Sequence, residues 1–140
     1  MKDSKDLTAL AAAINMGRGI GTGDDYKPWI QVTRNISSPC SNPNVGPVPH
    51  LKRLTHFLSR GEREFALYLW WLGAEDIREQ YPLWPWPHAH PEVQIALRTD
   101  ARPHPGMRAV AADAGIDLRD YRGTTTADIL TIDMMVTVSA

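Results

Sequence analysis

Cysteine is nearly absent from the sequence, since Cys40 is the single one among 140 residues. One thiol excludes an intramolecular disulfide and a zinc cluster built from cysteines. Long apolar runs are missing too, and none approaches the roughly 20 residues needed to span a bilayer. The N-terminal residues, MKDSKDLTAL, are too acidic and too weakly apolar for a signal peptide. We therefore expect a soluble, cytoplasmic protein with no membrane partner.

Neither sign of charge is in excess, because 15 basic and 16 acidic residues leave a net charge of −1. Bulk electrostatics therefore favour no class of partner. Basic side chains are nevertheless concentrated in one run, in which no acid precedes Glu62: His50, Lys52, Arg53, His56, Arg60 and Arg63. Such a run is most often a solvated face, and the alternative is a surface that contacts phosphates.

The pattern of apolar residues predicts one α/β domain, because 43% hydrophobic content is enough for a core at this length. Helices are expected over residues 6–14, 60–72 and 106–114, with a short helical patch over 92–97. Strands are expected over residues 75–82 and 127–138, and a short strand or an extended edge over residues 26–32. Residues 35–50 contain four prolines and predict an irregular loop. The glycine-rich residues 17–25 predict a connector, because no buried strand precedes them and no Gly-Lys-Ser/Thr ending follows.

Glu62 occupies an unusual position for a carboxylate. A spacing of about 100° per residue places it on one helical stripe with Leu58, Phe65, Leu69 and Leu72, whereas Glu64 lies off that stripe. A carboxylate on an apolar face is costly unless it is paired, hydrogen-bonded or bound to a metal. The alternative is that Glu62 interacts with the helix dipole and reaches water at the helix start.

Asp133 raises the same question on a strand. Alternation gives the strand one continuous apolar face, made by Leu130, Ile132, Met134, Val136 and Val138, and places Asp133 on the other face. Aspartate is depleted in strands, so this residue is either a metal ligand or a solvent-facing side chain on a one-sided strand. Together, Glu62 and Asp133 would suit Mg²⁺, which takes carboxylate oxygens, water and substrate phosphate.

Two histidines, His88 and His90, provide another possible pair of metal ligands. They lie in the segment LWPWPHAHP, where closely spaced prolines exclude regular structure. A proline-rich surface loop is the simpler interpretation of these histidines.

Four stretches of the chain resemble the N-terminal catalytic domain of TnsA, the endonuclease subunit of heteromeric transposases. They are GRGIGTGDDYKPWIQV, RLTHFLSRGE, DIREQYPL and LTIDMMVTV. The resemblance implies a restriction-endonuclease-like fold, in which helices flank a central mixed β-sheet. It divides the chain into an N-terminal helix over residues 1–16 and a TnsA-like domain over residues 17–140.

The resemblance also implies an activity: a Mg²⁺-dependent DNA endonuclease, with Mn²⁺ as a substitute, that cuts the 5′ strands at transposon ends. The glutamate of that family corresponds to Glu62 and its aspartate to Asp133, so both are expected to be catalytic metal ligands. Lys52, Arg53 and Arg60 are expected to contact the phosphates of double-stranded DNA. The implied protein partners are a TnsB-like transposase and a TnsC-like ATPase regulator.

One residue of the family pattern is missing. A lysine should follow Asp133 on the next strand, but no lysine follows Lys52 in this sequence. Three hypotheses stay open: a chain truncated before the final strands, a site completed by another chain, and a relative that does not cut DNA. A phage DNA-processing or head-completion nuclease of the same fold is a further alternative, as is an inactive DNA-binding or assembly module.

Overall fold

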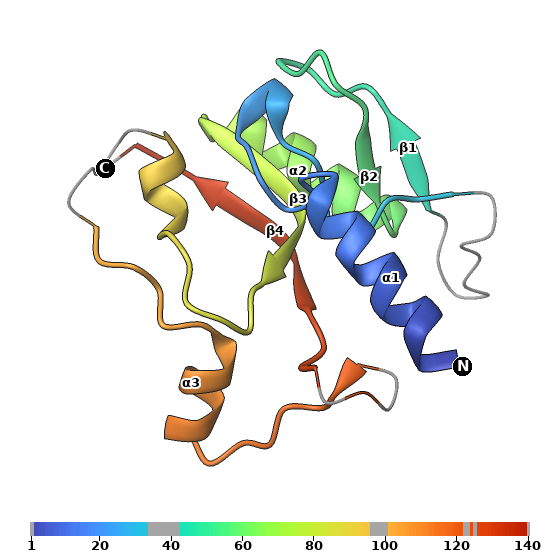
Figure 1. Ribbon diagram of the computed structural model, residues 1–140. Coiled ribbons are helices and arrows are strands. Elements are labelled where there is room, and N and C mark those ends of the chain that lie inside the picture. Colours follow the sequence, from blue (N-terminus) through green and yellow to red (C-terminus); the bar gives the residue numbers. More distant parts are fainter. Residues whose placement is uncertain (1, 34–42, 96–100, 122–123, 125, 140) are drawn as a thin grey trace. The chain divides into compact units, whose positions relative to one another are not determined.

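Three α-helices and four β-strands form the part of the chain that the computed structural model describes, residues 2–33, 43–95, 101–121, 124 and 126–139 (Figure 1). The helices are α1 (Lys2–Asn15), α2 (Arg60–Trp71) and α3 (Met107–Asp113). The strands are β1 (Asn44–Gly46), β2 (Thr55–Phe57), β3 (Asp76–Leu83) and β4 (Leu130–Thr137). Two short 3-10 helices are η1 (Gly23–Asp25) and η2 (Pro91–Ile95). The predicted α/β class is confirmed.

The strands form two small sheets within the described residues, β1 with β2 and β3 with β4. In the first sheet, β1 and β2 are antiparallel, and Val45 lies opposite His56. In the second, the N–H of Glu75 donates to the carbonyl of Thr137 at 2.8 Å. The start of β3 therefore lies beside the end of β4, as in an antiparallel pair. The mixed sheet of a restriction-endonuclease-like fold stays a prediction.

The chain divides into two compact units, which are described separately below. The α3 unit consists of Met1–Met16 and Pro82–Leu130, and the α2 unit consists of Gly17–Tyr81 and Thr131–Ala140. The predicted division into a helix over residues 1–16 and an endonuclease domain over residues 17–140 stays a prediction.

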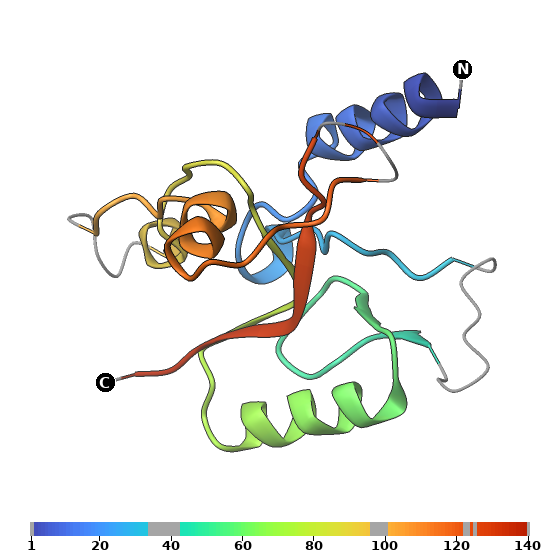
Figure 2. The same ribbon diagram turned by 90° about the horizontal axis from the view of Figure 1, so that it is seen from below.

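The core of the α2 unit lies between α2 and the strands. Figure 2 shows α2 running along one side of β4 and of the β1–β2 hairpin. The buried cluster there is Val48, Phe57, Ala66, Trp70 and Ile77, and Met134 and Val136 of β4 pack against it. The prediction that the even-numbered face of the last strand is apolar and faces a core is confirmed for these two residues.

The buried side of α2 differs from the predicted stripe. Ala66 and Trp70 face the core, while Phe65 and Leu72 are 54% and 58% exposed. The reason is that residues 65–72 are apolar almost all round the helix, so that hydrophobicity alone does not select one side. The buried residues Ala66 and Trp70 are four positions apart, and Glu62 lies one turn before Ala66 on the same side of the helix.

In the α3 unit, the carbonyl groups of residues 84–85, which precede η2, accept hydrogen bonds from the first residues of α3. The N–H of Met107 donates to the carbonyl of Trp84 at 2.9 Å, and that of Arg108 donates to Pro85 at 3.2 Å. Gly106 makes this approach possible, because its φ is +91° and an added Cβ would lie 2.5 Å from the carbonyl carbon of Trp86. Gly115, with φ +69°, follows α3 in the predicted left-handed conformation.

Some predicted elements have other outcomes. Residues 26–32 do not form a strand. The N–H of Trp29 in this segment donates to the carbonyl of Gln80 in β3 at 3.2 Å. The hairpin β1–β2 was not predicted, because each strand is only three residues long. Cys40 and residues 96–97 of the predicted 92–97 patch lie outside the described residues. Among those described, no helix is long and apolar enough to cross a membrane.

Candidate functional site

The strand β3 is buried along nearly its whole length although its sequence, DIREQYPL, is largely polar. Four of its polar residues are at most 6% exposed: Asp76, Arg78, Glu79 and Gln80. Buried polar groups cost free energy unless they have partners, so this strand needs hydrogen-bond partners from its surroundings.

The main partner of Glu79 is Arg53. The guanidinium and the carboxylate form a bidentate pair, with N–O distances of 2.7 Å and 2.8 Å. The side chain of Glu79 is 0% exposed and that of Arg53 is 10% exposed. The remaining donors of Arg53 reach the carbonyl oxygens of Gly23, Leu54 and Ile77. All five N–H groups of the guanidinium thus have acceptors inside the α2 unit. Arg53 therefore serves as a structural link between β3 and the loops around it.

Two further residues complete the surroundings of Glu79. The backbone N–H of His56 donates to Glu79 Oε1 at 3.0 Å, and the hydroxyl of Tyr26 donates to the carbonyl of Glu79 at 3.0 Å. Burial, followed by the nearby Glu79, raises the pKa of the Tyr26 phenol far above its ordinary value, so that it remains a donor. The Glu79 carboxylate is thus held by donors from Arg53 and His56, with no need for a metal ion there.

Glu62 lies at the start of α2, where it takes part in the helix cap. Its N–H donates to the Oγ of Ser59 at 3.1 Å, and the Ser59 hydroxyl donates to Glu62 Oε1 at 3.2 Å. Glu62 Oε2 accepts the N–H of Leu58 at 3.0 Å. This arrangement is close to a capping box, in which the third helical residue reaches back to the residues before the helix.

Gln80 joins Glu62 to the buried strand. Its Nε2 donates to Glu62 Oε2 at 3.0 Å, and Gln80 is 1% exposed. Its φ is +48°, which is uncommon for a residue other than glycine. Three of the roughly four lone-pair positions of the Glu62 carboxylate are then occupied by the described residues, which leaves one on Oε1.

Asp133 is exposed on β4. By strand alternation, its side chain is on the face opposite to that of Met134 and Val136, which pack toward α2. The described contacts bring Glu62 together with Ser59 and Gln80, and do not bring it together with Asp133. Among the described residues, no group of three histidine, cysteine or acidic side chains could hold a metal ion.

The other predicted cations are on the surface. Arg60 pairs with Glu64 one turn further along α2, at 2.7 Å, and the two side chains are 78% and 57% exposed. Glu64, which the periodicity places off the apolar stripe, is therefore on the solvent side of this helix. Lys52 is exposed, and its backbone N–H donates to Asp24 Oδ1 at 2.6 Å. Lys52 and Arg60 are thus positioned to meet a ligand from solvent.

In the α3 unit, His88 pairs with His104 rather than with His90. The two residues exchange backbone hydrogen bonds of 3.1 Å and 2.9 Å, and their ring centroids are 4.9 Å apart. Burial, with the neighbouring His88 and His90, lowers the pKa of His104 below its ordinary value. The ring of His90 instead lies beside Glu92, whose N–H reaches His90 Nδ1 at 3.3 Å.

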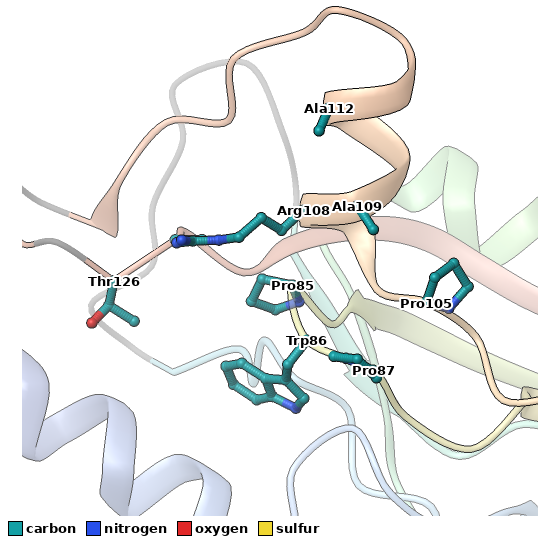
Figure 3. A pocket seen from close by; sticks show the side chains of 9 residues that line it. Pro85, Trp86, Pro87, Pro105, Arg108, Ala109, Ala112 and Thr126 are labelled. Carbon is teal, nitrogen blue, oxygen red and sulfur yellow. The ribbon is translucent and has the colours of Figure 1, made fainter.

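The α3 unit also contains an open pocket of about 560 Å³. Figure 3 shows that Trp86 and the prolines beside it line the pocket, together with Arg108, Ala109 and Ala112 from α3. Trp86 stacks on Trp84 with ring centroids 5.5 Å apart. The lining contains no carboxylate, so this pocket does not provide the oxygen ligands of a magnesium site.

Sequence reasoning missed two features of the α2 unit, the pairing of Arg53 with Glu79 and the cap of α2. The pair Arg53–Glu79 spans 26 positions and carries no local signal, so that only the folded chain reveals it. The cap of α2 did carry a signal, because SRGE (residues 59–62) before an apolar run is a capping-box pattern. That pattern gives Glu62 a structural task in addition to the predicted one.

Comparison with known proteins finds one informative relative. The chain is 35% identical over 118 residues to the transposon Tn7 transposition protein TnsA of Escherichia coli. The match covers 79% of this chain but only 40% of that relative. No family model matches the chain. The chain is therefore similar to that transposition protein over the aligned region, and it spans less than half of the relative's length.

Proposed function

We propose that this chain is a Mg²⁺-dependent DNA endonuclease of the TnsA kind, which hydrolyses phosphodiester bonds of the 5′ strands at transposon ends. The observation that carries the proposal is the 35% identity to the Tn7 transposition protein. The chain spans 40% of that relative, so the activity of the whole protein is part of the proposal. Single residues of this chain test it.

The proposed metal ligands are Glu62 and Asp133, with Mn²⁺ as a substitute for Mg²⁺. One carboxylate is enough for Mg²⁺, which fills its other positions with water and phosphate oxygen, so Glu62 can hold an ion although strand alternation places Asp133 on the face of β4 opposite to that of Met134 and Val136. Glu62 Oε1 retains a lone-pair position, and the carboxylate of Asp133 is exposed. When bound, the ion would polarise the phosphodiester and supply hydroxide. The chain's own part is to hold Glu62 in one orientation through Ser59 and Gln80.

The proposed contacts to double-stranded DNA come from Lys52 and Arg60. Both are exposed cations in the basic run that ends at α2. Arg53 was predicted to contact phosphates as well, but its donors all have acceptors within the chain. We therefore give Arg53 the role of holding β3 and the loop around Gly23 in place, and assign the phosphate contacts to its neighbours.

By the same similarity, a TnsB-like transposase and a TnsC-like ATPase are the proposed protein partners, and the cytoplasm is the proposed location. In that arrangement, this chain would cut one strand and the transposase the other. A mixture of the three proteins with transposon-end DNA should then cut both strands, whereas omission of this chain should leave the 5′ strands intact.

A DNA-binding or assembly module without catalysis is the second candidate. It is favoured by one observation: three of the roughly four lone-pair positions of the Glu62 carboxylate already accept hydrogen bonds, from Leu58, Ser59 and Gln80, as in a structural helix cap. This candidate predicts DNA binding that does not change with divalent metal.

Nicking of supercoiled plasmid DNA separates the two candidates. The matched variants are Glu62→Gln and Asp133→Asn, which remove a charge with little change in volume, and Glu64→Gln, which does the same on the exposed side of α2. We expect Mg²⁺-dependent nicking that falls by about 100-fold or more in the first two variants, as for loss of a group that stabilises developing charge. The Glu64→Gln variant should keep the wild-type rate. Equal rates in all variants would remove both residues from the site.

A further inference from the structure

The feature that leads beyond the proposed function is the backbone of Gln80. In an ideal strand, Gln80 and Ile77 would point to opposite faces, because they are three positions apart. Ile77 is 0% exposed in the core beneath α2. A regular strand would therefore direct Gln80 away from α2. The left-handed φ of +48° interrupts this alternation, and the Gln80 amide reaches Glu62 at the start of that helix.

The conformation is costly, and the surroundings stabilise it. A left-handed backbone is unfavourable for a residue with a Cβ, and it persists only where neighbouring contacts enforce it. Here the carbonyl of Gln80 accepts the N–H of Trp29 at 3.2 Å. The hydroxyl of Tyr26 also points to that carbonyl, at 3.5 Å. Glycine would adopt this φ at no cost but has no side chain, so glutamine serves a purpose that glycine does not.

We propose that Gln80 is a positioning residue, which fixes the Glu62 carboxylate so that Oε1 faces outward for a divalent metal. The amide donates to Oε2, the same oxygen that accepts the Leu58 N–H, so that within the described part of the chain Oε1 accepts only the Ser59 hydroxyl. The inference rests on the proposed metal role of Glu62. Hydrogen bonds of this kind orient metal-binding side chains, and their loss typically weakens metal affinity by about 10-fold to 100-fold.

Two substitutions separate positioning from folding. Gln80→Asn tolerates a left-handed backbone but shortens the side chain by one methylene, so that the amide no longer reaches Glu62. Gln80→His also tolerates this backbone and keeps an N–H donor, Nε2, at the same distance along the side chain. Histidine should therefore restore what asparagine removes.

The experiment measures Mn²⁺ binding to the full chain by electron paramagnetic resonance, together with thermal unfolding of each variant without metal. We expect Gln80→Asn to bind Mn²⁺ about 10-fold or more weakly, with an unfolding midpoint at or above that of the wild type, and Gln80→His to bind nearly as the wild type does. Wild-type affinity in Gln80→Asn would overturn the role of Gln80 and leave the proposed function intact. If the wild type and Glu62→Gln bind Mn²⁺ equally, or neither binds it, the metal role of Glu62 fails and the positioning role fails with it.

Discussion

At the scale of single residues, the α2 unit contains buried polar groups whose burial and pairing local sequence patterns do not predict. Glu79 has no exposed surface, and it binds Arg53 and the backbone of His56. Removing one partner of such a pair leaves an uncompensated buried charge, which typically costs about 3–5 kcal/mol. That cost explains why Arg53, although it lies within a basic run, is committed to the fold rather than to a ligand.

His56 gives a prediction on pH at this scale. Its Nδ1 accepts the N–H of Val32 at 3.0 Å, which requires the neutral ring. Burial lowers the pKa of His56 below the ordinary 6.5, and Arg53 and Arg18 act in the same direction, while Glu79 opposes them. As the pH falls through 6.5, the unfolded chain therefore takes up a proton that the folded chain excludes. Stability is full above that pH and is lost as the pH decreases toward the lower, folded pKa.

Urea unfolding at about pH 7.5 and about pH 5.5 checks this expectation. The matched variant is His56→Asn, whose Oδ1 can accept from Val32 but does not titrate. The free energy of unfolding should fall less between the two pH values in His56→Asn than in the wild type. His104 titrates in both proteins, so the difference between them isolates His56. An equal fall in both proteins would show that His56 contributes nothing to the acid sensitivity.

At the scale of elements, local patterns predict α2, α3, β3 and β4, because each has a run of suitable residues and clear ends. The hairpin β1–β2 escapes such reasoning. Its strands are three residues each, and it is held by pairing between positions such as Val45 and His56. The same limit applies to the site, since periodicity selects Glu62, but its contact with Gln80 joins residues 18 positions apart. Local patterns therefore do not predict contacts between residues that are far apart in the sequence.

The start of α2 provides the prediction at this scale. Ser59 caps the helix through its Oγ and also donates to Glu62, so Ser59→Ala removes both bonds. We expect a loss of about 1 kcal/mol in the free energy of unfolding, as for other helix caps. Ser59→Thr keeps the hydroxyl and should behave like the wild type. Urea unfolding of the three proteins measures the loss, and equal stability of all three would mean that the cap is not formed in solution.

At the scale of the whole molecule, net charge and local charge act differently. A chain with 15 basic and 16 acidic residues has no bulk attraction to DNA, so any binding must come from local groups. The concentration of cations before Glu62 is the strongest local asymmetry in the sequence. With Arg53 committed to Glu79, Lys52 and Arg60 are the exposed members to which the proposal assigns phosphates.

The salt dependence of DNA binding tests this assignment. Each phosphate contact releases counterions, so the slope of log K against log salt changes by about 0.9 for every contact that is lost. Lys52→Gln and Arg60→Gln should each reduce the slope by about that amount, measured by fluorescence anisotropy with a duplex oligonucleotide. The control is Arg119→Gln, an 83% exposed cation beside Asp128 and outside the basic run. If the control changes the slope as much as the other two variants, binding follows overall charge, and the basic run before α2 is an ordinary solvated surface.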